Sequence, residues 1–61
     1  ITIAVQINGK TKGTIDIELD TKEDVVFDKI LNNDRLNKYI DGLDIIRKIY
    51  IPNRLINILT L

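Results

Sequence analysis

The sequence contains no cysteine, histidine, methionine, tryptophan or serine. Without cysteine the chain has no disulfides, and without cysteine and histidine it lacks the usual ligands of a structural zinc ion. The missing serine, cysteine and histidine also remove the common nucleophiles and bases of covalent catalysis. A chain of 61 residues must therefore be stabilised by apolar packing, and it has room for one domain with one thin core.

Because the chain lacks methionine and begins at Ile1, we expect it to be a fragment of a longer polypeptide. It contains no apolar run long enough to cross a bilayer and no signal-peptide pattern. The formal net charge is zero, but the charges are segregated: residues 1–15 carry +2, residues 16–28 carry −5 and residues 29–61 carry +3. Two basic ends therefore flank an acidic centre.

Apolar residues alternate with polar ones from Ile1 to Ile7 and again from Ile15 to Leu19. A period of two predicts two half-buried strands. Asn8-Gly9 lies between them, and this dipeptide is a strong hairpin signal. The two strands are therefore expected to form an antiparallel hairpin.

The loop of this hairpin is constrained by parity, because the apolar residues of both strands occupy odd positions. We therefore expect a three-residue loop in which Gly9 is left-handed at a bulge. An irregularity at Gly13 is the alternative. The expected pairs are Val5 with Thr11 and Ile1 with Ile15. This register places four polar residues on the face away from the core: Gln6, Lys10, Lys12 and Thr14.

The middle of the chain has helical spacing. Thr21 precedes Glu23 and Asp24, which predicts a helix start with acids in its first turn. Four apolar residues at helical spacing are expected to cover the sheet: Val26, Phe27, Ile30 and Leu31. A second short helix is expected to carry Leu36, Tyr39 and Ile40 and to end near Asp41-Gly42.

The last part of the chain predicts a second hairpin. Ile45–Ile51 is rich in β-branched residues, Pro52-Asn53-Arg54 is typical of a tight turn, and Leu55–Leu61 forms the last strand. Apolar residues on both faces favour strands inside the sheet. We therefore predict an α+β fold: a four-stranded sheet in β-β-α-β-β order, β-grasp-like, with one or two short helices packed on one face.

The residues present offer little catalytic chemistry. Asp16, Glu18 and Asp20 are expected at successive outward positions of one strand, where carboxylates are solvated and discourage aggregation. Residues 20–28 lack the alternating oxygen ligands and central glycine of a calcium loop. Gly9 and Gly13 lie in a hairpin and do not open a helix, so they do not form a phosphate loop. Catalysis by the chain itself is not expected.

Binding is better supported by the basic residues. Lys10 and Lys12 project from the first hairpin, and Gln6 is expected on the same face. If the two hairpins lie side by side, the second adds Arg47, Lys48 and Arg54 to one phosphate-binding patch. The alternative is that these are ordinary exposed strand residues. Tyr39 is expected to be structural, whereas Tyr50 is either structural or a ring on which a base stacks.

Three motifs carry a resemblance to a known family. Residues 5–10, VQINGK, followed by Lys12-Gly13, are similar to the VQVNGK-x-RG motif of the C-terminal domain of bacterial leucyl-tRNA synthetases. Residues 37–42, NKYIDG, resemble that family's KYLEG turn, and residues 49–58, IYIPNRLINI, resemble its closing IYVPGRLVNIV. Two positions depart from the pattern: Lys12 stands where arginine is common, and Asn53 replaces a glycine.

The resemblance implies a function. It implies a single domain, residues 1–61, that a flexible linker joins to the body of a cytoplasmic synthetase, and that docks as a monomer on the elbow of leucine-accepting tRNA. Leucylation and editing, together with the ATP and Mg²⁺ that the parent enzyme uses, would belong to other domains. The motif positions expected to contact tRNA are Gln6, Asn8, Gly9, Lys10, Lys12 and Arg54, and Asn57 is a further polar position of the motif.

Two other functions remain open. The element order resembles the β-grasp group, which includes ubiquitin-like modifiers, but the chain ends in Leu59-Thr60-Leu61 where a modifier has a diglycine tail. The second alternative is a protein-interaction module that docks on its own parent protein through exposed apolar strand residues. The salt dependence of binding discriminates it from tRNA binding, because phosphate contacts depend steeply on salt.

Overall fold

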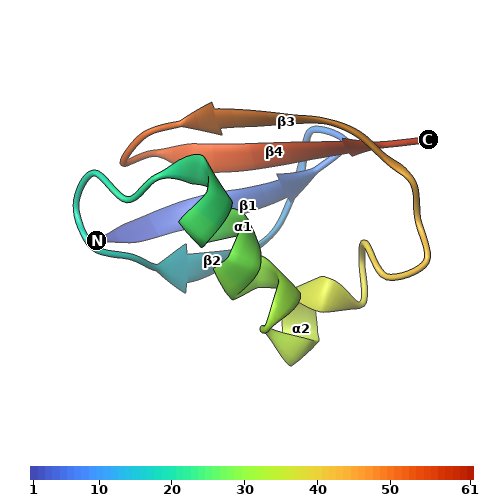
Figure 1. The fold of residues 1–61 in the computed structure, drawn as a ribbon, viewed down its shortest axis with the longest axis horizontal. Helices are drawn as coiled ribbons and strands as arrows, with labels where there is room; N and C mark the ends of the chain where they lie inside the picture. The colour runs from blue at the N-terminus through green and yellow to red at the C-terminus, as the bar shows by residue number, and fades with distance from the viewer.

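A computed structural model describes all residues from Ile1 to Leu61. The elements follow in the order β1 (Thr2–Ile7), β2 (Lys10–Asp16), α1 (Glu23–Leu31), α2 (Asp34–Asn37), β3 (Ile45–Ile51) and β4 (Leu55–Thr60). The strands form one sheet in the order β2-β1-β4-β3. Helix α1 lies across one face of this sheet, and α2 lies beside the β2 edge (Figure 1). The predicted α+β fold and its β-β-α-β-β order are confirmed.

The core lies between the two central strands and α1. Strands β1 and β4 run parallel at the centre of the sheet, and each pairs antiparallel with its hairpin partner on the other side. The largest fully buried side chains are Ile3, Val5, Val26, Ile30, Ile56 and Ile58. Fully burying one isoleucine or valine side chain stabilises a fold by about 1.5–3 kcal/mol, so these six residues contribute most of the stability.

Helix α1 begins one residue after the predicted start. Its N-cap is Lys22, whose side chain makes no capping hydrogen bond, while the Thr21 hydroxyl donates to the carbonyl oxygen of Glu18. Val26 and Ile30 are buried as predicted. The prediction that Leu31 also covers the sheet is wrong, because Leu31 is 42% exposed. It follows Ile30 by about 100° around the helix and so lies beside the buried stripe.

Helix α2 is a single turn with a well-formed start. The side-chain oxygen of Asn33 accepts hydrogen bonds from the backbone N–H groups of Arg35 and Leu36, at 3.0 and 3.2 Å. The predicted second helix is shorter than expected, because Tyr39 and Ile40 lie in the turns that follow it. Leu36 and Ile40 nevertheless join the core, as their spacing predicted.

The first hairpin has a two-residue turn, and the prediction of a three-residue loop is wrong. Asn8 and Gly9 both have positive φ, 51° and 84°, which is the geometry of the favoured hairpin turn and suits these two residue types. The extra residue that parity demands is a bulge further along, where Lys12 has no partner between Thr11 and Gly13. The observed pairs include Ile3 with Ile15, Val5 with Gly13 and Gln6 with Thr11.

Strand β2 ends earlier than predicted. It stops at Asp16, and Leu19 is 65% exposed in the loop that leads to α1. Glu18 and Asp20 therefore do not continue an outward row from Asp16, as the sequence suggested. Asp20 has a φ of 63°, so the chain turns at this point instead of extending.

The second hairpin has the predicted bounds within one residue. Its register pairs Ile51 with Leu55, and Asn53 occupies the turn with a φ of 64°. The prediction that both of its strands lie inside the sheet holds only for β4, because β3 is an edge strand. Its apolar side chains are consequently exposed: Ile45, Ile46, Ile49 and Ile51.

Neither helix is long and apolar enough to cross a membrane.

Candidate nucleic-acid interface

The tip of the first hairpin is fastened to the last strand. The Asn8 amide nitrogen donates to the Thr60 hydroxyl at 2.9 Å, and the Asn8 side-chain oxygen accepts from the Thr60 backbone N–H at 2.9 Å. The Gly9 backbone N–H donates to the side-chain oxygen of Asn57 at 3.0 Å. Asn8 and Asn57 therefore hold the tip of the hairpin in place.

Gln6 lies on the face of the sheet opposite the helices. Its amide nitrogen reaches the hydroxyl of Thr11, its cross-strand partner, at 3.5 Å. Residues directly opposite each other in a sheet share a face, and the neighbours Val5 and Ile7 are buried on the helix side.

Lys10 and Lys12 do not share that face, and the prediction that they do is wrong. Lys10 lies opposite Ile7, whose side chain is buried toward the helices, so Lys10 belongs to the helix-bearing side. Lys12 is the bulged residue, and its Nζ lies 5.3 Å from the centre of the Tyr39 ring. The bulge shifts parity by one residue, which is why a register without it assigned both lysines to the outer face.

The cations of the second hairpin do not join those of the first. The hairpins lie side by side, but β1 and β4 run parallel, so the two turns lie at opposite ends of the sheet (Figure 1). Arg54 follows the β3–β4 turn, and its carbonyl oxygen accepts from Ala4 N–H at 3.1 Å. Arg47 and Lys48 lie on β3, about 14 Å across the sheet from β2 at the usual strand spacing. The single patch predicted from the sequence is therefore not formed.

Helix α2 and the turn after it supply cations that the sequence interpretation left out. Lys38 Nζ lies 5.3 Å from the Tyr39 ring centre, the same distance as Lys12 Nζ. Arg35 lies with Lys12 along the space between β2 and α2. We call Lys12, Arg35 and Lys38 the β2–α2 basic surface. No periodicity links these residues, since 23 positions separate Lys12 from Arg35, and only folding brings them together.

Both tyrosine side chains make contacts within the fold. Tyr39 packs against the core and carries the two lysines at its ring, at a distance typical of cation–π contacts. The Tyr50 hydroxyl donates to the carbonyl oxygen of Thr21 at 2.6 Å. Tyr50 therefore ties β3 to the loop before α1, which favours its structural interpretation over base stacking.

The side chains do not form a metal site. No group of three or more aspartate or glutamate residues converges to hold a metal ion, and every buried polar side-chain atom has a hydrogen-bond partner. What the surface offers is hydrogen-bond donors and positive charge. Such groups bind phosphates without distinguishing base sequence.

Known proteins resemble the chain over nearly its whole length. It is 45% identical over 58 residues to the leucine–tRNA ligase of Petrotoga mobilis, and these residues make up 95% of this chain and 7% of that protein. It is 35% identical over 57 residues to the enzyme of Chlorobium phaeobacteroides, covering 93% of the chain and 7% of that protein. The chain thus spans about 7% of the length of these relatives. No protein-family model matches it.

The fold is shared as well. A solved structure of the leucyl-tRNA synthetase agnB2 of Agrobacterium radiobacter K84, in a ternary complex with tRNA and LeuAMS, aligns with a TM-score of 0.89 at 30% identity. The alignment covers 100% of this chain and 8% of that one. Sequence and fold agree that this chain is homologous to a segment of about 60 residues of bacterial leucine–tRNA ligases.

Proposed function

We propose that this chain is the C-terminal domain of a bacterial leucyl-tRNA synthetase and that it docks on the elbow of tRNA, where the D and T loops meet. The observation that carries the proposal is the match of the entire chain, at 30% identity, to a synthetase solved together with tRNA. The domain would support leucylation and editing by holding the outer corner of the tRNA while other domains of the parent perform the chemistry.

The charge distribution supports this function. The β2–α2 basic surface groups three cations beside one edge of the sheet, and Lys10, at the start of β2, is exposed as Lys12 is. Gln6, Asn8 and Gly9 shape the hairpin tip that presents them, and Arg54 offers a separate cation toward the other end of β4. Contacts from these groups to the RNA backbone depend on charge and geometry and not on base identity, so we expect little discrimination among tRNAs.

The chain's own residues do not suit the cofactors of the parent enzyme. ATP-dependent ligation uses nucleotide phosphates and Mg²⁺, which prefers carboxylate and phosphate oxygen ligands. No acidic group of three converges here, and Gly9 lies in a hairpin turn instead of opening a helix. ATP and Mg²⁺ are therefore assigned to other parts of the cytoplasmic parent.

The test is a tRNA titration of the isotope-labelled chain, followed by NMR at low and moderate salt. Replacing Lys10 and Lys12 by alanine should weaken binding about tenfold or more and lower the slope of log K against log salt by about 1 to 2, since each phosphate contact contributes about 0.7–0.9. The matched control is Lys22→Ala with Lys29→Ala, which removes two exposed lysines outside the surface. Equal loss in both double variants, or no loss in either, contradicts the assignment.

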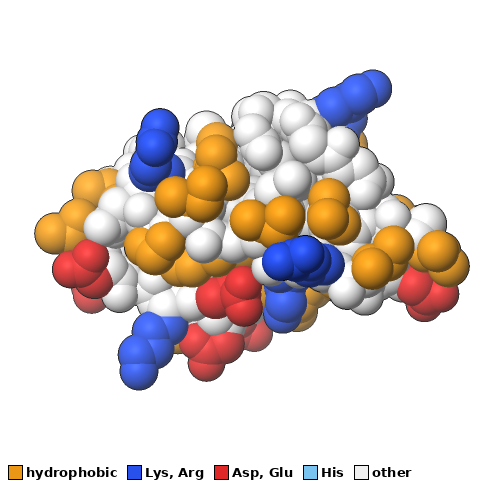
Figure 2. All heavy atoms as spheres, turned by 90° about the horizontal axis from the view of Figure 1, so that it is seen from above, with side chains coloured by type: hydrophobic (Ala, Val, Ile, Leu, Met, Phe, Trp, Pro, Cys, Tyr) orange, Lys and Arg blue, Asp and Glu red, His pale blue; other side chains and the backbone are white.

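A second candidate function rests on the β3 edge. Ile46 is 63% exposed and Ile51 41% exposed. Figure 2, seen from the β3 side of the molecule, shows hydrophobic side chains distributed along this face among both basic and acidic ones. An exposed apolar edge strand is suited to pairing with another protein segment. In this alternative the module docks on the rest of its own parent, and its binding would depend only weakly on salt.

A further inference from the structure

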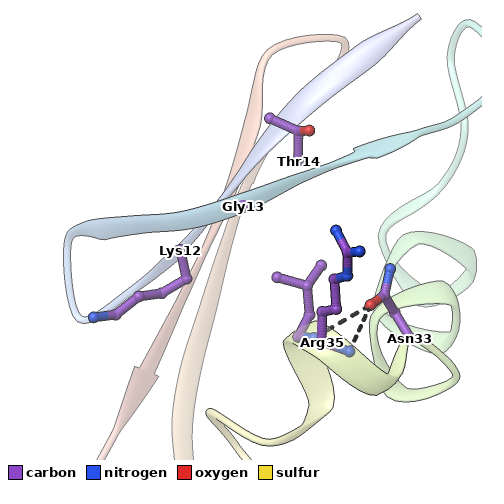
Figure 3. A pocket seen from close by; sticks show the side chains of 6 residues that line it. Lys12, Gly13, Thr14, Asn33 and Arg35 are labelled. Atoms are coloured by element: carbon purple, nitrogen blue, oxygen red, sulfur yellow. Dashed lines mark hydrogen bonds between the residues drawn. The ribbon is translucent and has the colours of Figure 1, made fainter.

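A cavity of about 300 Å³ lies between the bulged part of β2 and α2 (Figure 3). Two of the lining side chains are cations, none is an acid and only one is hydrophobic. Such a lining repels a metal ion and offers little to an apolar ligand, whereas it favours an anion. The lining residues are Lys12, Gly13, Thr14, Asn33, Arg35 and Leu36.

Two local features of the chain build this cavity. The bulge at Lys12 bends β2 next to α2, as bulges commonly do at sheet edges. Gly13 then lets the helix approach closely, because a Cβ at this position would lie 2.9 Å from Leu36 Cδ2. The cavity therefore lies where the bulged strand and α2 come close together.

The donors around the cavity come from both elements. Arg35 extends from α2 toward β2, and the amide nitrogen of Asn33 points to the same side (Figure 3). The side-chain oxygen of Asn33 is occupied as the helix cap, which orients the amide group and leaves its nitrogen available to donate. A guanidinium has five N–H donors in a planar fork that matches the oxygens of a phosphate.

The free edge of β2 adds a backbone donor. Ile17 N–H donates to the carbonyl oxygen of Ile1 at 2.8 Å, and in an antiparallel ladder alternate residues bond to the neighbouring strand. The N–H of Thr14 therefore faces the open edge, on which the cavity lies. The Thr14 side chain points away from Arg35 (Figure 3), so Thr14 lines the cavity with its backbone.

Lys12 is the second cation among the lining residues. Its side chain leaves the strand away from Arg35 (Figure 3) and its Nζ lies beside the Tyr39 ring. Lys12 therefore lines one end of the cavity, while its charged group lies toward Tyr39 and away from Arg35 (Figure 3). The guanidinium of Arg35 provides the directional contact.

We propose that this cavity binds one phosphate group, and that in the tRNA complex the group belongs to the RNA backbone. The RNA assignment rests on the proposed tRNA-binding function. In it the directional phosphate contacts are made by Arg35, Asn33 and the Thr14 backbone N–H, in addition to the hairpin lysines. The close approach at Gly13 and the Asn33 cap place these groups beside one another. One backbone phosphate bound here adds a defined contact point between the domain and the RNA, which sets the orientation together with other phosphate contacts.

The first arm of the test uses inorganic phosphate with the 61-residue chain, followed by amide shifts and compared with chloride at equal ionic strength. Saturable shifts at Gly13, Thr14, Asn33 and Arg35 are expected. Arg35→Gln should abolish them, Arg35→Lys should retain them weakly because it keeps charge but loses the fork, and the control Lys29→Gln should leave them unchanged. Absent shifts, or shifts unaffected by Arg35→Gln, overturn the phosphate site.

The second arm uses tRNA with the same variants. Arg35→Gln should weaken binding about tenfold and lower the salt slope by about 1, while Lys29→Gln leaves both unchanged. If the Lys10 and Lys12 double variant loses affinity but Arg35→Gln does not, the RNA assignment of the cavity is overturned and the tRNA-binding function stands. If no form binds tRNA but phosphate still shifts these amides, the proposed function fails and the anion site is upheld.

Discussion

Gly13→Ala should destabilise the domain by a steric conflict with α2. A Cβ at this position would lie 2.9 Å from Leu36 Cδ2, well inside the 3.5–4.0 Å at which carbon atoms attract. Leu36 is 3% exposed and packs in the core, but it also lines the cavity beside Gly13, so a change of rotamer relieves part of the conflict. Overpacking of this kind costs about 1–3 kcal/mol, and the lower entropy of an unfolded chain with alanine offsets about 0.4–1 kcal/mol. The difference between these ranges is about 0–2.6 kcal/mol, and we expect a net loss near the middle, about 1 kcal/mol.

That loss is measurable in a small domain. A chain of this size is stable by about 3–9 kcal/mol, at about 0.05–0.15 kcal/mol per residue, so the change is a large fraction of the total. Urea unfolding followed by circular dichroism gives the free energy for Gly13→Ala, for Leu36→Val and for the double variant. Because Leu36→Val removes the conflicting Cδ2 atom, the double variant should be more stable than the sum of single losses implies, by about 1 kcal/mol.

Gly9→Ala is the control for this cycle. A Cβ at Gly9 meets no atom within 4 Å, but the residue has a φ of 84°, so alanine there costs about 1–2 kcal/mol through left-handed backbone alone. Its loss should add to that of Leu36→Val without coupling. A Gly13→Ala variant as stable as the unchanged chain, or a fully additive Gly13 and Leu36 cycle, would refute the steric argument.

Two further predictions concern the contacts that hold the loop before α1. Asn53→Gly suits the φ of 64° but loses both hydrogen bonds between Asn53 and Asp20, so the free energy of unfolding should fall by about 1 kcal/mol. Hydrogen exchange at the Asp20 amide should become faster, and an unchanged rate contradicts the prediction. Tyr50→Phe removes the hydrogen bond to the Thr21 carbonyl oxygen and should lower the free energy of unfolding by about 0.5–1.5 kcal/mol. Thermal unfolding measures the change, and an unchanged midpoint would show that water replaces the bond fully.

Local patterns predicted most elements correctly. Asn8-Gly9 marked the hairpin, Ile45–Ile51 was found with its observed bounds, and Val26 and Ile30 marked the buried stripe of α1. These signals succeed because each depends on residues close together in sequence. Leu31 and Leu19 were placed wrongly, since an apolar residue at the end of a periodic run is buried only where a neighbouring element reaches it.

The candidate site was predicted less well for the same reason. Lys10 and Lys12 were identified as exposed cations, but their face was wrong because the extra residue sits in a bulge at Lys12 and not in the turn. Both arrangements satisfy the parity of the apolar residues. Asn8-Gly9 favours the two-residue turn on its own, and this preference was the signal that separates the two registers.

The sequence by itself determined the order of the elements, most of the buried residues and, through three local motifs, the relationship to leucyl-tRNA synthetases. Only the tertiary structure decided which cations are neighbours. The parallel pairing of β1 with β4 places the two hairpin turns at opposite ends of the sheet, so Arg54 is separated from Lys12. The close approach at Gly13 brings Arg35 to the same cavity as Lys12. Contacts of this kind depend on how whole elements pack, and the spacing of residues along the chain does not reveal them.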